Sequence, residues 1–265
     1  MLAPLLLAAS LAASPSSAAA VLANRTAFNR PCVDFVSTAP ERLAAEASGA
    51  LRLLGWEVGE VVGPKFDQGE SLAQIGRAGA LYVHSHGDHY WDAATGSRSS
   101  GFRVDGGSCR NAPTVIAPEI SAVRPNSGPL MLAVISTCHN GERTSKLPAA
   151  FGIAMKKTAP GSIGPRSFYL GYAGVAWVRG IVRFERHFWR ALRRGLPTGA
   201  AFDQALLSGY APADLAPDQG WDQLRWQVEM GADEAILEAP VDRFAASAGR
   251  PPKFCRSTKC RMPTL

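Results

Sequence analysis

With 265 residues, the chain is long enough for one large domain or two small ones. Hydrophobic residues make up 46% of it and charged residues 19%, a balance that favours a globular fold with a core and excludes an intrinsically disordered chain. The formal net charge is +6, but no nucleic-acid-binding motif accompanies it, so we expect no nucleic-acid partner.

The N-terminal stretch is uncharged and resembles a leader for export. An apolar run at residues 5–9 is followed by small residues at 16–20, which matches the apolar and cleavage regions of a signal peptide. The stretch is too short and too rich in Ala and Ser for a stable membrane span. We therefore expect a signal peptide at 1–20, a mature domain at 21–245 and a secreted or periplasmic protein of bacterial origin.

Strand and helix patterns alternate along the rest of the chain. We expect strands at 32–37, 56–62, 80–85, 130–136 and 168–178, and helices at 41–54, 148–157, 181–194 and 199–208, with a hairpin or surface loop at 95–107. This alternation predicts a single α/β domain with a mainly parallel sheet and helices on both faces.

Much of the positive charge falls on the predicted helix at 181–194 and just before it. Most of these arginines share one face, opposite Ile181, Phe184, Phe188 and Leu192. They are Arg179, Arg183, Arg186, Arg190, Arg193 and Arg194. We interpret this face as solvated, with contact to an anionic polymer or a membrane surface as the alternative.

The odd number of cysteines, five, suggests paired structural cysteines and one free thiol in an exported chain. Cys255 and Cys260 could close a loop in the tail at 246–265, and Cys32 could then pair with Cys109. Cys138 would remain free, although the sequence leaves the connectivity open.

Two segments carry the residue types of a catalytic site. One apolar strand runs into His84-Ser85-His86-Gly87-Asp88-His89, and another runs into Cys138-His139-Asn140-Gly141. Sites in open α/β sheets form beyond the carboxyl ends of the strands, so neighbouring strands would bring His86 and Cys138 together. An imidazole can take the proton of a thiol and pass it to a leaving amine.

This order and spacing resembles the caspase-like (clan CD) cysteine peptidases, which include caspases, metacaspases, gingipains and CHAT-type peptidases. Cys138-His139-Asn140-Gly141 is similar to the Cys-His-Ser-Gly of metacaspases, and the resemblance covers about residues 32–208. It implies a caspase-haemoglobinase-like three-layer sandwich, a protein or peptide substrate and no cofactor. Cys138 would be the nucleophile and His86 the general acid and base.

The resemblance also implies supporting roles for neighbouring residues. The amide groups of Gly87 and Cys138 would hold the oxyanion, and Arg179 would line a substrate pocket. Asp88 would orient His86 or line a pocket, or else be a solvated acid in the loop. Metacaspases carry an acidic residue just upstream of the cysteine, where this chain has Ser136 and Thr137. A preference for Arg or Lys in the substrate is therefore not expected from the resemblance.

Two other functions fit parts of the same sequence. His84, His86, Asp88 and His89 match the His-x-His-x-Asp-His zinc signature of metallo-β-lactamase-fold hydrolases, although that fold needs further ligands downstream. A caspase-like scaffold that binds without turnover is the other alternative.

Overall fold

The computed structural model describes residues 17–24, 38–105, 112–142, 144–153, 167–172, 174, 176 and 178–209, without the side chains of 178–180, 208 and 209. In chain order its elements are β1 (Ala18–Ala23), α1 (Ala39–Leu53), β2 (Glu57–Val62), η2 (Gly63–Lys65), α2 (Gln68–Arg77), β3 (Ala80–His84), β4 (Gly87–Asp92), β5 (Ser97–Arg103), β6 (Thr114–Ile116), α3 (Ala117–Val123), β7 (Leu132–Ser136), α4 (Leu147–Ala150), β8 (Phe168–Gly171), α5 (Val178–Arg193) and α6 (Thr198–Gly209).

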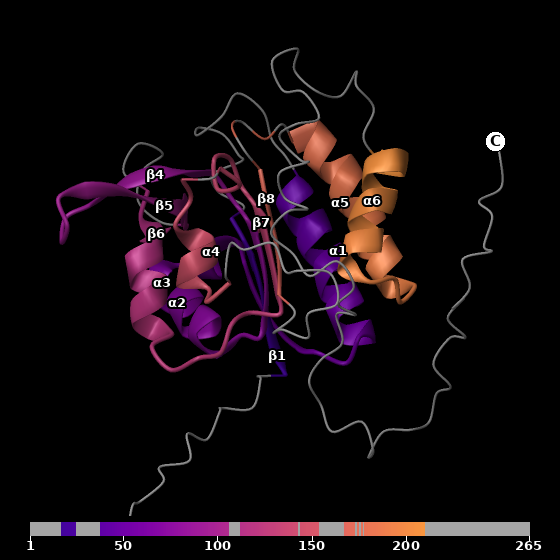
Figure 1. The fold of residues 1–265 in the computed structure, drawn as a ribbon, viewed down its shortest axis with the longest axis horizontal. Coiled ribbons are helices and arrows are strands. Elements are labelled where there is room, and N and C mark those ends of the chain that lie inside the picture. The colour runs from indigo at the N-terminus through magenta and orange to yellow at the C-terminus, as the bar shows by residue number, and fades with distance from the viewer. Residues whose placement is uncertain are drawn as a thin grey trace, which may run out of the picture.

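A parallel sheet of five strands forms the centre of the described structure, in the order β2-β1-β3-β7-β8 (Figure 1). A second, antiparallel sheet of three strands, β4-β5-β6, lies to one side of it. From β1 the chain first adds β2 on one side and then adds β3 on the other, so the strand order reverses between β1 and β3. Ligands of open α/β sheets bind at such a switch point.

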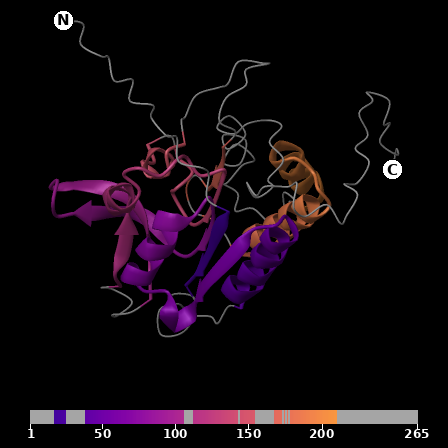
Figure 2. The same cartoon turned by 90° about the horizontal axis from the view of Figure 1, so that it is seen from below.

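Helices cover both faces of the parallel sheet, as Figures 1 and 2 show. Side chains alternate along β3, so Tyr82 packs toward α1, α5 and α6, whereas Leu81 and Val83 pack toward α2, α3, α4 and the small sheet. All five residues of β3 and of β7 are buried, as expected for parallel strands covered on both faces. The predicted α/β class, with a mainly parallel sheet and helices on both faces, is confirmed.

The first strand, β1, crosses the predicted boundary between the leader and the mature domain. Ala18–Ala23 lies between β2 and β3 and is almost completely buried, so a cut between residues 20 and 21 would divide an interior strand. An uncharged run rich in Ala, Val and Leu fits a leader and also fits a strand buried on both faces, and composition does not separate the two.

Most of the other predicted elements in the described ranges are confirmed within a few residues, including α1, β2, β3, β7, α5 and α6. The predicted strand at 168–178 is wrong in length, since β8 ends at Gly171. The prediction missed α2, which Asp67 caps by accepting a hydrogen bond from the Glu70 amide, and it missed β6 and α3.

Several predictions concern residues outside the described ones: the strand at 32–37, the cysteines other than Cys138, and the tail at 246–265. In the part of the chain that the structure describes, no helix has the length and apolar character that a bilayer crossing requires.

Candidate active site at the carboxyl ends of β3 and β7

Strands β3 and β7 are direct neighbours, as the sequence analysis required. They pair in parallel with His84 opposite Ser136, and the Ser85 amide extends the pairing by donating to the Ser136 carbonyl at 3.3 Å. His86 and Cys138 each follow two residues after this last pair. The fold therefore brings the two predicted catalytic residues out at the same edge of the sheet.

Gly87 lies against the backbone of the Cys138 segment. A Cβ atom at this position would overlap the Cys138 carbonyl oxygen, the Asn140 side-chain amide and the Thr137 hydroxyl. Any residue other than glycine would push β4 away from the end of β7. The glycine of the His-Gly pair is thus required by the contact between the two segments.

The amide of Gly87 is not used by the ladder between β4 and β5. Gly87 lies opposite Phe102, and the Arg103 amide donates to the His86 carbonyl at 2.9 Å. In antiparallel pairing, this bond makes Gly87 and Phe102 a non-hydrogen-bonded pair, so the Gly87 amide points away from β5. The geometry is compatible with the predicted oxyanion donor.

Cys138 is half-buried, and its thiol is protonated at rest. Burial raises the pKa of the thiol, and the nearby Asp88 carboxylate raises it further. The Ala176 amide opposes this effect by donating a hydrogen bond to Sγ at 3.3 Å. A thiol of this kind needs a base to become a nucleophile.

The turn after Cys138 holds an uncommon backbone conformation. His139 has a φ of 60°, the left-handed region that residues with a Cβ rarely adopt. Its amide donates to the Gly174 carbonyl at 2.8 Å, and the Gly141 amide donates to the Tyr172 carbonyl at 2.9 Å. These two bonds tie the turn to the segment after β8 and compensate for the strain.

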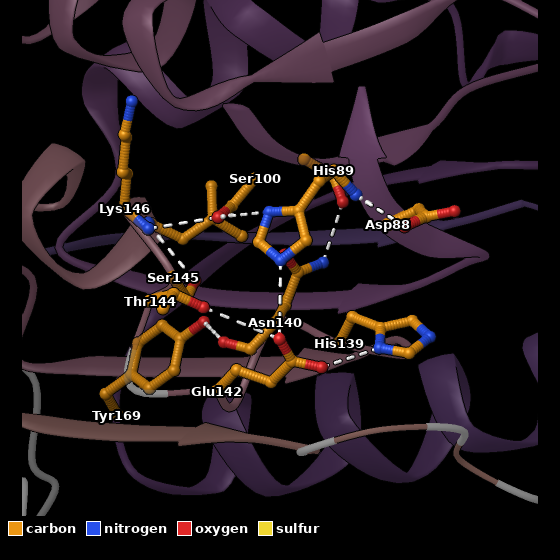
Figure 3. Close-up of polar contacts among 12 residues, drawn as sticks. Asp88, His89, Ser100, His139, Asn140, Glu142, Thr144, Ser145, Lys146 and Tyr169 are labelled. Carbon is orange, nitrogen blue, oxygen red and sulfur yellow. Dashed lines mark hydrogen bonds and ion pairs between the residues drawn. The ribbon is translucent and has the colours of Figure 1, made fainter. Parts of the chain in front are cut away.

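Asn140 fastens the same turn from inside. Its side chain is fully buried and donates to the Gly101 carbonyl at 2.7 Å and the Thr137 hydroxyl at 2.6 Å. Its own carbonyl accepts a hydrogen bond from the Tyr169 hydroxyl at 2.6 Å (Figure 3). Asn140 therefore connects β7, the β4–β5 hairpin and β8 next to Cys138.

A group of three polar residues at the surface, which we call the rim cluster, lies beside the turn: His89, His139 and Glu142 (Figure 3). Glu142 contacts His139 Nδ1 at 2.6 Å through Oε1 and His89 Nε2 at 3.4 Å through Oε2. Burial alone would raise the pKa of Glu142, but the hydrogen bonds with His139 and His89 outweigh it, and the pKa is lowered. The cluster links β4 to the turn after Cys138.

A second group of polar residues lies beneath the site, on the α5 side of the sheet. We call it the buried cluster: Tyr82, His84, Ser136, Tyr172 and Glu185. The Tyr82 and Tyr172 hydroxyls donate to the two carboxylate oxygens of Glu185 at 2.8 Å and 3.0 Å. His84 Nδ1 lies 2.8 Å from the Ser136 hydroxyl.

Burial controls the ionisation of this buried cluster. It lowers the pKa of His84 to about 3, an effect that the neighbouring His86 reinforces, so His84 is neutral at ordinary pH. It raises the pKa of Glu185 to about 7, although hydrogen bonds with Ser136, Tyr82 and Tyr172 act in the opposite direction.

The residues of the predicted zinc signature do not converge. His84 is buried against Ser136, His89 contacts Glu142 in the rim cluster, and Asp88 is exposed on β4. Among the described residues, no group of three or more His, Cys, Asp or Glu side chains could hold a metal ion. The arrangement does not fit the zinc-site interpretation.

Of the two predicted supporting side chains, the structure describes that of Asp88 but not that of Arg179. Asp88 lies close enough to Cys138 to affect the pKa of its thiol, and its carboxylate accepts the His89 amide at 2.7 Å. The side chain of Arg179 is outside the described residues, so its predicted pocket role stays a prediction.

Neither the rim cluster nor the buried cluster is predicted from the sequence. Glu185 could have been noticed, because it is the single acidic residue on α5 and stands directly beside the apolar-face residue Phe184. The sequence around Glu142 carries no such signal, because its partner His89 is 53 residues away in the chain and only the fold brings the two together.

Comparison with protein-family models gives no match for this chain, and comparison with curated proteins gives none either.

Proposed function

We propose that this chain is an exported cysteine endopeptidase of the caspase-like type, with His86 and Cys138 as its catalytic dyad. One observation carries the proposal: β3 and β7 pair in parallel, so that the His86-Gly87 and Cys138 segments leave the sheet side by side. The contact of Gly87 with the Cys138 backbone supports it further.

The first step would be attack by Cys138 on a peptide carbonyl carbon. His86 removes the thiol proton as the sulfur–carbon bond forms, because burial keeps the resting thiol protonated. The negative charge moves to the carbonyl oxygen, where the amides of Gly87 and Cys138 would donate hydrogen bonds.

The second half of the reaction releases both products. The protonated His86 gives its proton to the leaving amine as the carbon–nitrogen bond breaks, which leaves a thioester on Cys138. Water, deprotonated by His86, then attacks the thioester carbon and releases the carboxylic acid, and the thiol recovers its proton. No cofactor enters this sequence.

Export is part of the proposal and sets a condition on processing. Since Ala18–Ala23 is an interior strand, a leader peptidase would have to cut before Ala18 to leave the sheet intact. N-terminal sequencing of the protein recovered from the culture medium or the periplasm would test this condition.

The proposal is tested by the reactivity of Cys138 and by turnover. We expect iodoacetamide to label Cys138 at a rate at least about tenfold lower in His86→Ala, and hydrolysis of a peptide library to fall by about a hundredfold or more. Cys138→Ser should abolish hydrolysis. His187→Ala, which removes an imidazole from α5 far along the chain from the two catalytic segments, is the matched control and should behave like the wild type.

Each alternative function has its own outcome in this experiment. Labelling that is unaffected by His86→Ala, together with about two bound zinc ions per chain, would overturn the peptidase and favour a metal site. Labelling that depends on His86 without hydrolysis of any library member would favour a binding protein built on the same scaffold.

A further inference from the structure

Glu185 has no exposed surface, although it belongs to a residue type that is rarely buried. It lies on the face of α5 that packs against the sheet, beside the fully buried Phe184, Phe188 and Trp189. An apolar side chain would fill the same space without the cost of removing a carboxyl group from water. Packing alone therefore does not account for a glutamate here.

The hydrogen bonds of Glu185 connect three elements. Tyr82 donates to it from β3, and Tyr172 donates from the residue that follows β8. Tyr172 also accepts the Gly141 amide through its carbonyl, which places the turn after Cys138 on the other side of the same residue. A change at Glu185 can thus reach this turn through a single residue.

The buried cluster also lies directly below the proposed dyad. His84 and Ser136 are the last paired residues of β3 and β7, and their side chains contact one another at 2.8 Å. His86 is two residues beyond His84, and Cys138 is two residues beyond Ser136. His84 and His86 are close enough for the charge of one to act on the other.

We propose that Glu185 is a positioning residue for the dyad of His86 and Cys138. Through Tyr172, and through Ser136 and His84, it fixes the strand ends that carry the dyad. When Glu185 is ionised, it also stabilises the imidazolium form of His86. This inference rests on the proposed function. The site would then be more responsive to pH than an isolated Cys–His pair, because two linked groups titrate.

The other charged groups near these residues are few in the described structure. Helices α1 and α6 contribute apolar side chains such as Leu43 and Phe202 to the core cluster that contains Phe184 of α5. Glu46 of α1 faces Arg186 and Arg193 at the surface.

Around His86, the β4–β5 hairpin contributes Asp88, Tyr90 and Arg103, and Tyr90 contacts the His86 carbonyl at 3.5 Å. Burial raises the pKa of Tyr90 to about 12, so it stays neutral. Asp88 and Arg103 have charged side chains, as has Glu142 of the rim cluster, and Glu185→Gln changes none of them.

The test is the pH dependence of Cys138 alkylation by iodoacetamide in the full chain. We expect the midpoint of the rate profile to fall by roughly half a pH unit in Glu185→Gln, since loss of the negative charge favours neutral His86. The shift should persist at high salt, because a buried charge is poorly screened. Glu46→Gln, which removes a surface carboxylate facing α5, should leave the midpoint unchanged.

A second variant, Tyr172→Phe, allows the same test if Glu185→Gln does not fold. Tyr172→Phe removes one donor to the carboxylate, which raises the pKa of Glu185 and should move the midpoint in the same direction by a smaller amount. A uniform fall in rate at every pH, without a shift of the midpoint, would overturn the inference. If His86→Ala is alkylated at the wild-type rate, the proposed dyad is wrong. That result would overturn the proposed function, whereas an unshifted midpoint in Glu185→Gln would overturn only the inference on Glu185.

Discussion

The rim cluster and the buried cluster each hold a glutamate, but in opposite surroundings. Each has a glutamate whose two oxygens contact two side chains, His139 and His89 for Glu142, and Tyr82 and Tyr172 for Glu185. The pKa of Glu142 is lowered, whereas that of Glu185 is raised to about 7. The contacts of Glu142 thus outweigh its partial burial, whereas the hydrogen bonds of Glu185 do not outweigh its complete burial.

The difference also separates two structural roles. The rim cluster joins β4 to the turn after Cys138 where water can replace any lost contact. The buried cluster joins α5 to β3 and to the residue after β8, where no water is at hand to satisfy a lost partner. Substitutions in the buried cluster should therefore have the larger effects on stability.

The largest expected effect concerns His84. Its pKa is about 3 in the fold and near 6.5 in an unfolded chain, so its contribution to stability is fully present above pH 6.5 and is lost as the pH falls toward 3. The full loss would be on the order of 5 kcal/mol. We expect His84→Asn, which keeps an amide near the position of Nδ1, to flatten this acid limb in urea unfolding.

The matched comparison is with His89 of the rim cluster. His89→Asn should change the acid limb far less than His84→Asn, because the contact with Glu142 that it removes is partly exposed. If His84→Asn and His89→Asn change the acid limb equally, burial does not distinguish the two clusters.

A smaller effect with the opposite sign is expected for Glu185. Its pKa is about 7 in the fold against an ordinary value of 4.5, so its contribution is fully present below pH 4.5 and is lost as the pH rises through 7. The loss would be about 3 kcal/mol. Glu185→Gln, which is neutral at every pH, should remove this fall in the free energy of unfolding with rising pH.

The two slopes oppose one another between pH 4.5 and 6.5, the range that both titrations share. Wild-type protein should therefore show a plateau there, and each single substitution should uncover the slope of the other residue. A plateau that survives in both variants would contradict the assignment of these two pKa shifts.

The parts of the fold that are set by short apolar or amphipathic stretches could be predicted from the sequence. The apolar runs of β3 and β7 and the amphipathic face of α5 identified the strands, the helix and the edge of the sheet where His86 and Cys138 lie. The predicted leader at 1–20 includes the first half of strand Ala18–Ala23, because the composition of this stretch suits both environments. Only the pairing of the strand with β2 and β3 reveals the sheet.

The two clusters depend on contacts between distant segments, which explains why they were not predicted. Tyr82 and Glu185 are 103 residues apart in the chain, and His89 and Glu142 are 53 apart. Neither pair has a periodic signature. A lone acid on the apolar face of a helix is a signal for an internal partner, but it does not identify the tyrosines that serve it.

The smallest effect is expected at Glu142. Because its pKa is lowered in the fold, its contribution is present above pH 4.5 and is lost as the pH falls. About 30% of its side chain is exposed, and solvent weakens such pairs, so we expect the loss to stay below about 1 kcal/mol. Urea unfolding of the wild type and Glu142→Gln at pH 7 and pH 3 measures it, with Glu185→Gln as the buried counterpart. A change above about 2 kcal/mol would mean that the rim cluster behaves as a buried site, and the contrast between the two glutamates would no longer rest on solvent access.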